Sequence, residues 1–99
     1  MSETRRIDIQ LPGDVMWTQL GDEVAILNSS TGTYFGLDAV GSRIWCLIAQ
    51  KLSPEQIVAT MLSEYAVDEE QVRRDFDELI EKLAKRALIT ISNPEEKPE

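Results

Sequence analysis

The segment from Leu27 to Asp38 constrains the fold of this chain most strongly, because it predicts two strands joined by a short turn. The turn is Ser29-Ser30-Thr31-Gly32, in which Gly32 can adopt a positive φ. The second strand, Thr33 to Leu37, is short, and a helix follows it at once near Val40-Gly41. A strand in this place ends a small sheet. The unpaired backbone groups of such an edge strand can accept another chain as an added strand.

The side chains of this edge strand divide between two faces. Alternation places Phe35 and Leu37 on one face and Tyr34 and Gly36 on the other. Gly36 has no side chain to pack, which weakens a strand unless another group approaches it closely. The same pattern also fits a hydrophobic strand that has no binding role.

The composition indicates one globular domain with one modest core, since the 99 residues are 42% hydrophobic. The net charge of −8 opposes binding to duplex nucleic acid, which depends on Lys and Arg neutralising phosphates, and to anionic membranes. No apolar run approaches the roughly 20 residues of a membrane span, and no signal-like segment opens the chain. We therefore expect a cytoplasmic protein.

The usual equipment of an enzyme is missing from the sequence. Histidine is absent and Cys46 is the only cysteine, so neither a Cys–His pair nor a zinc site of the usual N/S type can be built. Cys46 lies between Trp45 and Leu47 in an apolar helix, which favours a buried structural thiol. We expect no catalytic residues, no metal and no cofactor.

The remaining pattern predicts a meander followed by three helices. The expected strands are residues 15–20, 23–28 and 33–37, and their short connections make them antiparallel neighbours. Asp38, Ser53 and Asp68 are expected to cap the three helices, and Ser53-Pro54-Glu55-Gln56 has the spacing of a capping box. The apolar stripe of the third helix consists of Val72, Phe76, Leu79, Ile80 and Leu83. A three-stranded sheet packed on three helices is an α+β fold.

The ends of the chain differ from the domain between them, which we place at residues 15–91. Residues 1–14 form either a short strand or an N-terminal arm. Residues 88–91 are expected to form a last extended segment. The composition of residues 92–99 predicts a disordered tail.

The acidic surface of the third helix is expected to be mostly solvated, as such surfaces usually are. Asp75 is the exception of interest, because it flanks the apolar stripe and could also meet a basic residue of a partner.

Together these motifs resemble one family. The chain looks like a member of the PqqD family, which is named for the pyrroloquinoline quinone synthesis protein D. The motifs that carry the resemblance are Thr31-Gly32-x-Tyr34-Phe35-x-Leu37-Asp38 after Asn28, then Val40-Gly41-x-x-Ile44-Trp45, Tyr65-x-Val67-Asp68 and Asp75-x-x-x-Leu79-x-x-Leu83. The resemblance covers about residues 15 to 91. One departure is Ala87, since the family often has glycine before the closing Leu-Ile pair.

The resemblance implies a winged helix-turn-helix-like domain that binds the leader segment of a ribosomally made, post-translationally modified peptide as an added strand. The implied groove lies between the third strand and the third helix. Carried onto this chain, its residues are Thr33, Tyr34, Phe35, Gly36, Leu37, Val72, Asp75, Phe76 and Leu79.

A chain of this size resembles the small leader-binding protein of lasso peptide pathways. That protein presents the precursor to a separate leader peptidase and an ATP-dependent cyclase. Other family members assist radical S-adenosylmethionine enzymes, so that partnership stays open. A winged-helix DNA-binding regulator is a further alternative, although the acidic charge and the lack of a basic face on the second and third helices oppose it.

Overall fold

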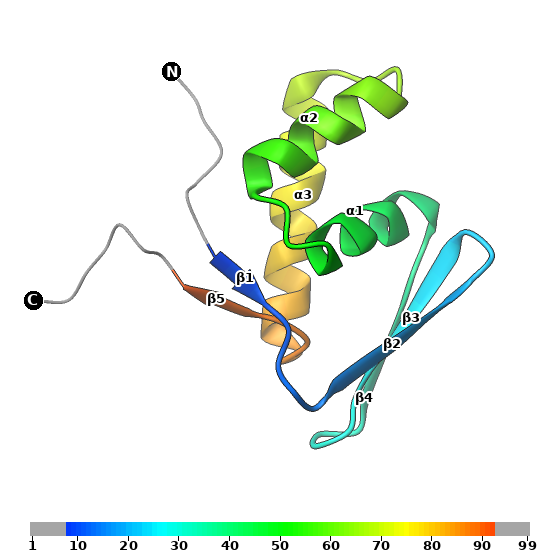
Figure 1. Ribbon diagram of the computed structural model, residues 1–99, viewed down its shortest axis with the longest axis vertical. Coiled ribbons are helices and arrows are strands. Elements are labelled where there is room, and N and C mark those ends of the chain that lie inside the picture. The colour runs from blue at the N-terminus through cyan, green and yellow to red at the C-terminus, as the bar shows by residue number, and fades with distance from the viewer. Residues whose placement is uncertain (1–7, 93–99) are drawn as a thin grey trace, which may run out of the picture.

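Residues 8–92 are described by the computed structural model, and they form two antiparallel sheets and three helices (Figure 1). The elements are β1 (Asp8–Gln10), β2 (Val15–Leu20), β3 (Glu23–Asn28), β4 (Thr33–Leu37), α1 (Ala39–Ala49), α2 (Pro54–Glu64), α3 (Glu69–Lys85) and β5 (Thr90–Ser92). The main sheet has the order β2-β3-β4 and packs on the helices. The predicted α+β fold is confirmed.

The second sheet is a small ribbon in which β1 pairs with β5. Its register places Ile9 opposite Ile91. Residues 8–10 of the predicted arm are therefore a strand, and the last extended segment forms its strand slightly later than expected, at residues 90–92. Residues 1–7 and 93–99, which include most of the predicted tail, lie outside the described residues. Within the described part of the chain, no helix is both long enough and apolar enough to cross a membrane.

Two of the three predicted helix caps form as expected. An Asp38 carboxylate oxygen accepts the Gly41 N–H at 2.9 Å at the start of α1. At the start of α2, the Ser53 hydroxyl accepts the Gln56 N–H and the Gln56 side chain accepts the Ser53 N–H, which completes the capping box. Asp68 occupies the N-cap of α3 as predicted, but its side chain makes no capping hydrogen bond. Glu69 and Glu70 supply negative charge to this helix terminus.

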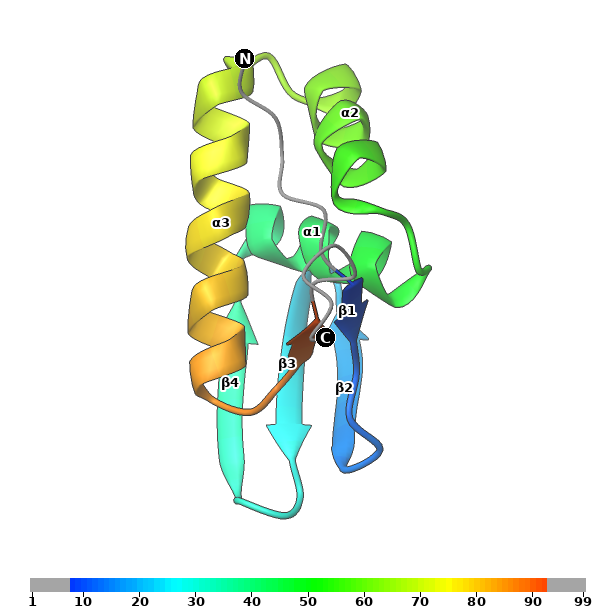
Figure 2. The same cartoon turned by 90° about the vertical axis from the view of Figure 1, so that its left-hand side faces the viewer.

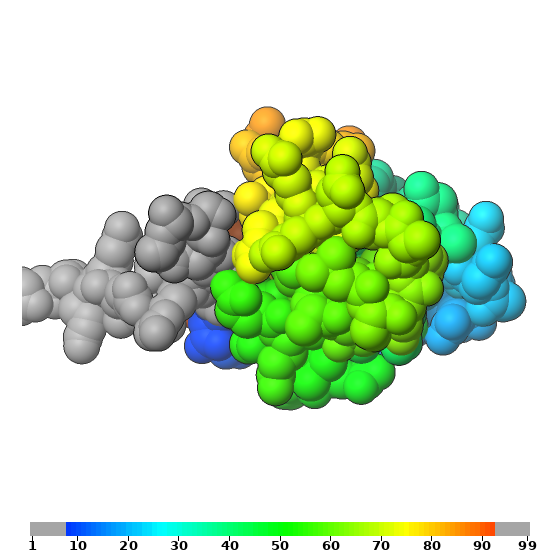
Figure 3. All heavy atoms as spheres, turned by 90° about the horizontal axis from the view of Figure 1, so that it is seen from above, coloured from blue at the N-terminus to red at the C-terminus, as the bar shows by residue number. Residues whose placement is uncertain are grey.

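The core lies between the inner face of the main sheet and the three helices. In Figure 2 the lower turns of α3 pass in front of β4, while α1 and α2 lie above the main sheet. Figure 3 shows α2 packed beside the first turns of α3, and Figures 1 and 2 show α2 at the other end of the molecule from the main sheet. The largest fully buried side chains include Ile26, Ile44, Trp45, Phe76, Ile80 and Leu83. The buried side chains of α3, which are Phe76, Ile80 and Leu83 in this set, pack in the core and hold the helix beside the sheet.

The end of α3 shows why a glycine would suit position 87. Leu88 N–H bonds to Leu83 C=O at 2.9 Å and Ala87 N–H bonds to Ala84 C=O at 3.1 Å, which is a Schellman motif. This motif needs a left-handed residue after the helix, and Ala87 has φ of 60°. Glycine adopts this conformation without the steric cost that a Cβ brings.

We therefore expect Ala87→Gly to stabilise the chain. Removal of the Cβ should raise the free energy of unfolding by about 0.5–1 kcal/mol, because relief of the left-handed strain outweighs the added entropy of the unfolded chain. Urea titration followed by circular dichroism measures the change. Ala59→Gly, on the exposed side of α2, is the control and should cost about 1 kcal/mol. Equal destabilisation by both substitutions would contradict the strain argument.

Candidate peptide-binding site

β4 is an edge strand, and the hydrogen bonds of one buried serine show which of its backbone groups are free. The Ser42 hydroxyl accepts the Val24 N–H at 2.7 Å and donates to the Leu37 C=O at 3.2 Å. It thus bridges the backbone groups of paired residues on β3 and β4. The Val24 and Leu37 groups must therefore point toward each other between the two strands.

Antiparallel pairing alternates, so this observation fixes the direction of every backbone group in β4. The groups of Phe35 face β3, while the N–H and C=O of Tyr34 and Gly36 face the free edge. The Ser29 N–H to Asp14 C=O hydrogen bond, at 2.9 Å, gives the same alternation from the β2 side. Two residues of β4 therefore offer unpaired backbone groups to an added strand.

A groove of about 380 Å³ lies between β4 and α3. It is lined by Phe35, Gly36, Leu37, Asp38, Val40, Gly41, Ile44, Asp75, Glu78, Leu79 and Lys82. An added Cβ on Gly41 would approach an Asp38 carboxylate oxygen at 3.2 Å and a Leu37 methyl at 3.4 Å, so glycine allows the start of α1 to lie tightly against the end of β4. At the other end, the Arg86 guanidinium lies 4.9 Å from the centre of the Phe35 ring.

Five of the nine predicted peptide-binding residues line this groove: Phe35, Gly36, Leu37, Asp75 and Leu79. Thr33 and Tyr34 belong to the same edge strand but do not line it. The Tyr34 side chain is 68% exposed and points to the outer face of the sheet, away from the side that carries Leu37. The backbone of Tyr34 faces the free edge even though its side chain does not face the groove.

Val72 and Phe76 lie apart from the groove. Val72 lines a smaller apolar hollow of about 80 Å³, which shares Val40, Ile44 and Asp75 with the groove. Phe76 was predicted to contact the peptide, but its side chain is only 1% exposed and lines neither hollow. The physical reason is helical phase, because Phe76 points into the core one position away from Asp75.

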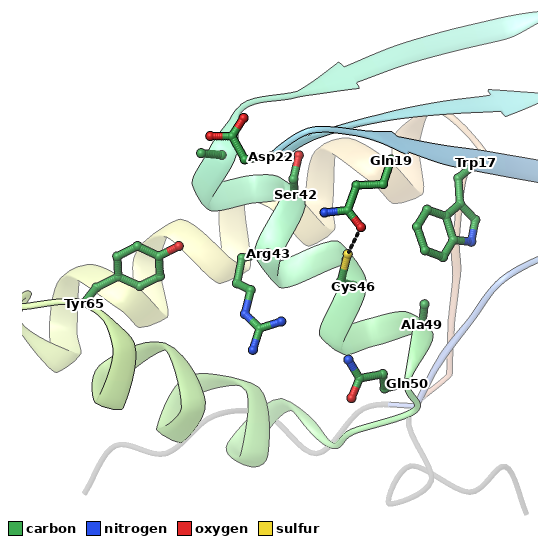
Figure 4. Close-up of a pocket in the computed structure, with 10 residues that line it drawn as sticks. Trp17, Gln19, Asp22, Ser42, Arg43, Cys46, Ala49, Gln50 and Tyr65 are labelled. Atoms are coloured by element: carbon green, nitrogen blue, oxygen red, sulfur yellow. Dashed lines mark hydrogen bonds between the residues drawn. The ribbon is translucent and has the colours of Figure 1, made fainter.

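A larger hollow, about 630 Å³, lies on another side of α1 and is lined by residues that include Trp17, Gln19, Arg43, Cys46 and Tyr65 (Figure 4). The Cys46 thiol is 3.7 Å from the Gln19 side-chain oxygen and is only half-buried, so the expectation of a buried thiol needs correction.

Arg43 makes a bidentate ion pair with Glu64, and this hydrogen bonding lowers the pKa of the Glu64 carboxyl. Among residues 8–92, no group of three or more His, Cys, Asp or Glu side chains could hold a metal ion.

Comparison with known proteins identifies the family. The model for coenzyme PQQ synthesis protein D (PqqD) matches residues 23–89. The chain belongs to the PqqD family. A search of curated proteins found no match to this PqqD-family chain.

Two solved structures resemble the PqqD-family chain over most of its length. TbiB1 in complex with the TbiA(beta) leader peptide is 40% identical, with a TM-score of 0.78, and the match covers 91% of this chain and 99% of that one. A lasso peptide synthetase B1 complexed with the leader peptide is 20% identical, with a TM-score of 0.77, and the match covers 84% and 98% of the two chains. The second likeness shows the shared fold.

Sequence reasoning missed six residues that line the groove in this PqqD-family chain: Asp38, Val40, Gly41, Ile44, Glu78 and Lys82. Two signals could have identified several of them. Glu78 and Lys82 follow Asp75 at spacings of three and seven residues, which places all three on one side of a helix. Asp38 and Val40 directly follow the edge strand.

Cys46→Ala tests the role of the half-buried thiol. The substitution should leave peptide binding within about twofold of wild type, because Cys46 lines the hollow that does not adjoin β4. Isothermal titration calorimetry measures the affinity, and thermal unfolding measures the modest loss of stability from a smaller side chain. A folded Cys46→Ala protein with a large loss of affinity would place the peptide in the larger hollow instead.

Proposed function

We propose that this chain is a non-catalytic leader-peptide-binding protein, which captures a ribosomally made precursor by adding the leader as a strand to β4. The observation that carries the proposal is the open edge of β4 facing a groove walled by α3. A relative that is 40% identical was solved with a leader peptide, which supports the same role here. We further propose that the chain presents the precursor to a leader peptidase and a cyclase of a lasso peptide pathway in the cytoplasm.

The physical basis of such binding is a division between backbone and side chains. The exposed backbone groups of Tyr34 and Gly36 can pair with a peptide of almost any sequence. Phe35 and Leu79 offer apolar surface to peptide side chains within the groove. These contacts must exceed the entropy that a disordered leader loses when it becomes a strand.

The alternative of a DNA-binding regulator has less support. α3 carries Glu69, Glu70, Asp75, Asp77, Glu78 and Glu81 along its length. These acidic side chains outnumber the basic ones of α3, and the whole chain has a net charge of −8, so a phosphate backbone would meet repulsion. The proposal therefore predicts peptide binding and no binding to duplex DNA.

Fluorescence anisotropy tests the two functions side by side, with a labelled TbiA(beta) leader peptide and a labelled random-sequence DNA duplex. A peptide selected from a displayed random library replaces the TbiA(beta) leader if it binds more tightly. The tighter binder of the two is called the reference peptide. We expect saturable binding of the reference peptide and none of the duplex. Tight, salt-sensitive binding of the duplex without any peptide binding would overturn the proposal.

The role in presentation needs a separate measurement. Cleavage of a precursor by the leader peptidase of the same gene cluster should be much faster when this chain is present. The same assay with a radical S-adenosylmethionine enzyme as partner separates the two kinds of pathway. Equal cleavage with and without the chain would rule out presentation while leaving peptide binding intact.

A further inference from the structure

The groove is acidic at the end where β4 runs into α1. Asp38 follows β4 directly, and Asp75 lies across from it on α3, beside Val40 and Ile44 of α1. Glu78 extends the same wall by one helical turn. This end would attract a basic side chain of a bound peptide.

The groove is basic at the end where the β3–β4 hairpin meets the end of α3. Lys82 lines the groove there, and the Arg86 guanidinium lies over the Phe35 ring. The buried Asn28 fixes this arrangement, because its side-chain amide donates to the Ala87 C=O at 2.6 Å while its oxygen accepts N–H groups of the hairpin turn. The hairpin and the basic end of α3 are thus joined.

No ion pair among the described residues neutralises the charges of the groove, although the Asp38 carboxylate accepts the Gly41 N–H and the Asp75 carboxylate accepts a hydrogen bond from the Gln71 side chain at 2.9 Å. The ion pairs within 4 Å among residues 8–92 join Arg43 to Glu64 and Arg73 to Glu55 and Glu69. None of them engages Asp75, Glu78 or Lys82, or Arg86 beside them. A groove that was acidic throughout would favour any basic peptide. This groove is acidic at one end and basic at the other, so it can distinguish the order of charges in a peptide.

The two walls have matching lengths. Asp75 and Lys82 are seven residues apart on α3, which is about 10 Å at the helical rise. Phe35 lies in β4, and Asp38, the extended residue that follows the strand, comes three residues later, which is also about 10 Å. An extended peptide covers this distance in roughly three or four residues.

We propose that the groove selects peptides by charge order. The preferred segment has a Lys or Arg, then apolar residues, then an Asp or Glu about four residues later. The order follows from antiparallel docking, the pairing used throughout the main sheet, because such a strand runs from the acidic to the basic end. This inference rests on the proposed peptide-binding function.

Selection from a phage-displayed library of random twelve-residue peptides tests the proposal. Wild-type protein should enrich peptides with the basic residue first. The double substitution Asp75→Lys/Lys82→Glu keeps the net charge at −8, since one change adds two charges and the other removes two, and it should enrich the opposite order. Asp75→Asn and Lys82→Gln are milder variants, and each should relax the preference at one end only.

Affinities of individual peptides give the size of the effect. An enriched peptide should bind roughly tenfold more tightly than the same peptide with its charged residues exchanged, and high salt should reduce this ratio. Enriched peptides with no charge order, or an order that the double substitution leaves unchanged, would overturn the inference alone. If wild-type protein enriches no peptides, or if Gly36→Pro protein enriches them equally well, peptide binding at β4 is overturned and the inference with it.

Discussion

Gly36→Pro should weaken binding of the reference peptide by roughly 100-fold while the chain stays folded. Proline removes the Gly36 N–H, which faces the free edge of β4 and takes no part in pairing with β3. The bound peptide would lose a donor and keep an unpaired carbonyl, at a cost of about 1–3 kcal/mol, and the ring would obstruct the incoming strand. Calorimetry measures the affinity and circular dichroism the fold.

Three control variants make this result specific. Gly36→Ala keeps the N–H, and its Cβ would meet no atom within 4 Å, so we expect near-normal binding. Gln19→Pro places proline at a free-edge position of β2, the opposite edge of the sheet, and should leave the affinity unchanged. Phe35→Pro removes a group that faces β3 and should damage the fold itself. Wild-type affinity in folded Gly36→Pro protein would show that the peptide docks elsewhere.

Phe76→Ala should lower the free energy of unfolding by about 3–5 kcal/mol, which is a large share of the stability of a domain of this size. The reason is burial, because the 1% exposed side chain packs behind the groove wall and its loss leaves a cavity. Urea titration measures the loss. Binding should fall only as far as the folded fraction falls.

Leu79→Ala is the matched variant on the groove side of α3. Leu79 is half-buried and lines the groove, so its truncation should cost about 1 kcal/mol of stability but reduce the affinity several-fold. The opposite result, with Phe76→Ala fully stable and defective only in binding, would show that Phe76 contacts the peptide directly.

The sequence predicts the elements of this fold well because they depend on local patterns. Alternation in Thr33–Leu37 and the capping box at Ser53 are each encoded by a few neighbouring residues, and both form as expected. The sequence does not decide between a strand and an arm at residues 8–10, because the partner strand β5 lies some 80 residues away along the chain. Pairing across that distance leaves little local signal.

The groove could be predicted only in part. The edge strand and the flank of α3 were identified, but the distinction between Asp75 and Phe76 depends on the rotation of α3, which an apolar stripe fixes only to within about one residue. No local pattern places Lys82 and Arg86 at one end of the groove, since that position depends on where the hairpin packs. The direction of the free backbone groups follows from the strand register, and the Ser42 bridge that reveals it has no sequence signature.

The most direct test of strand addition is amide hydrogen exchange by NMR, with and without the reference peptide. The Tyr34 and Gly36 amides face the free edge, so they should exchange quickly in the free protein and become strongly protected in the complex. The Phe35 amide, which faces β3, and the Trp17 and Gln19 amides at the β2 edge should change little. Unchanged exchange of Tyr34 and Gly36 at saturating peptide, or new protection at Trp17 and Gln19 instead, would contradict docking at β4.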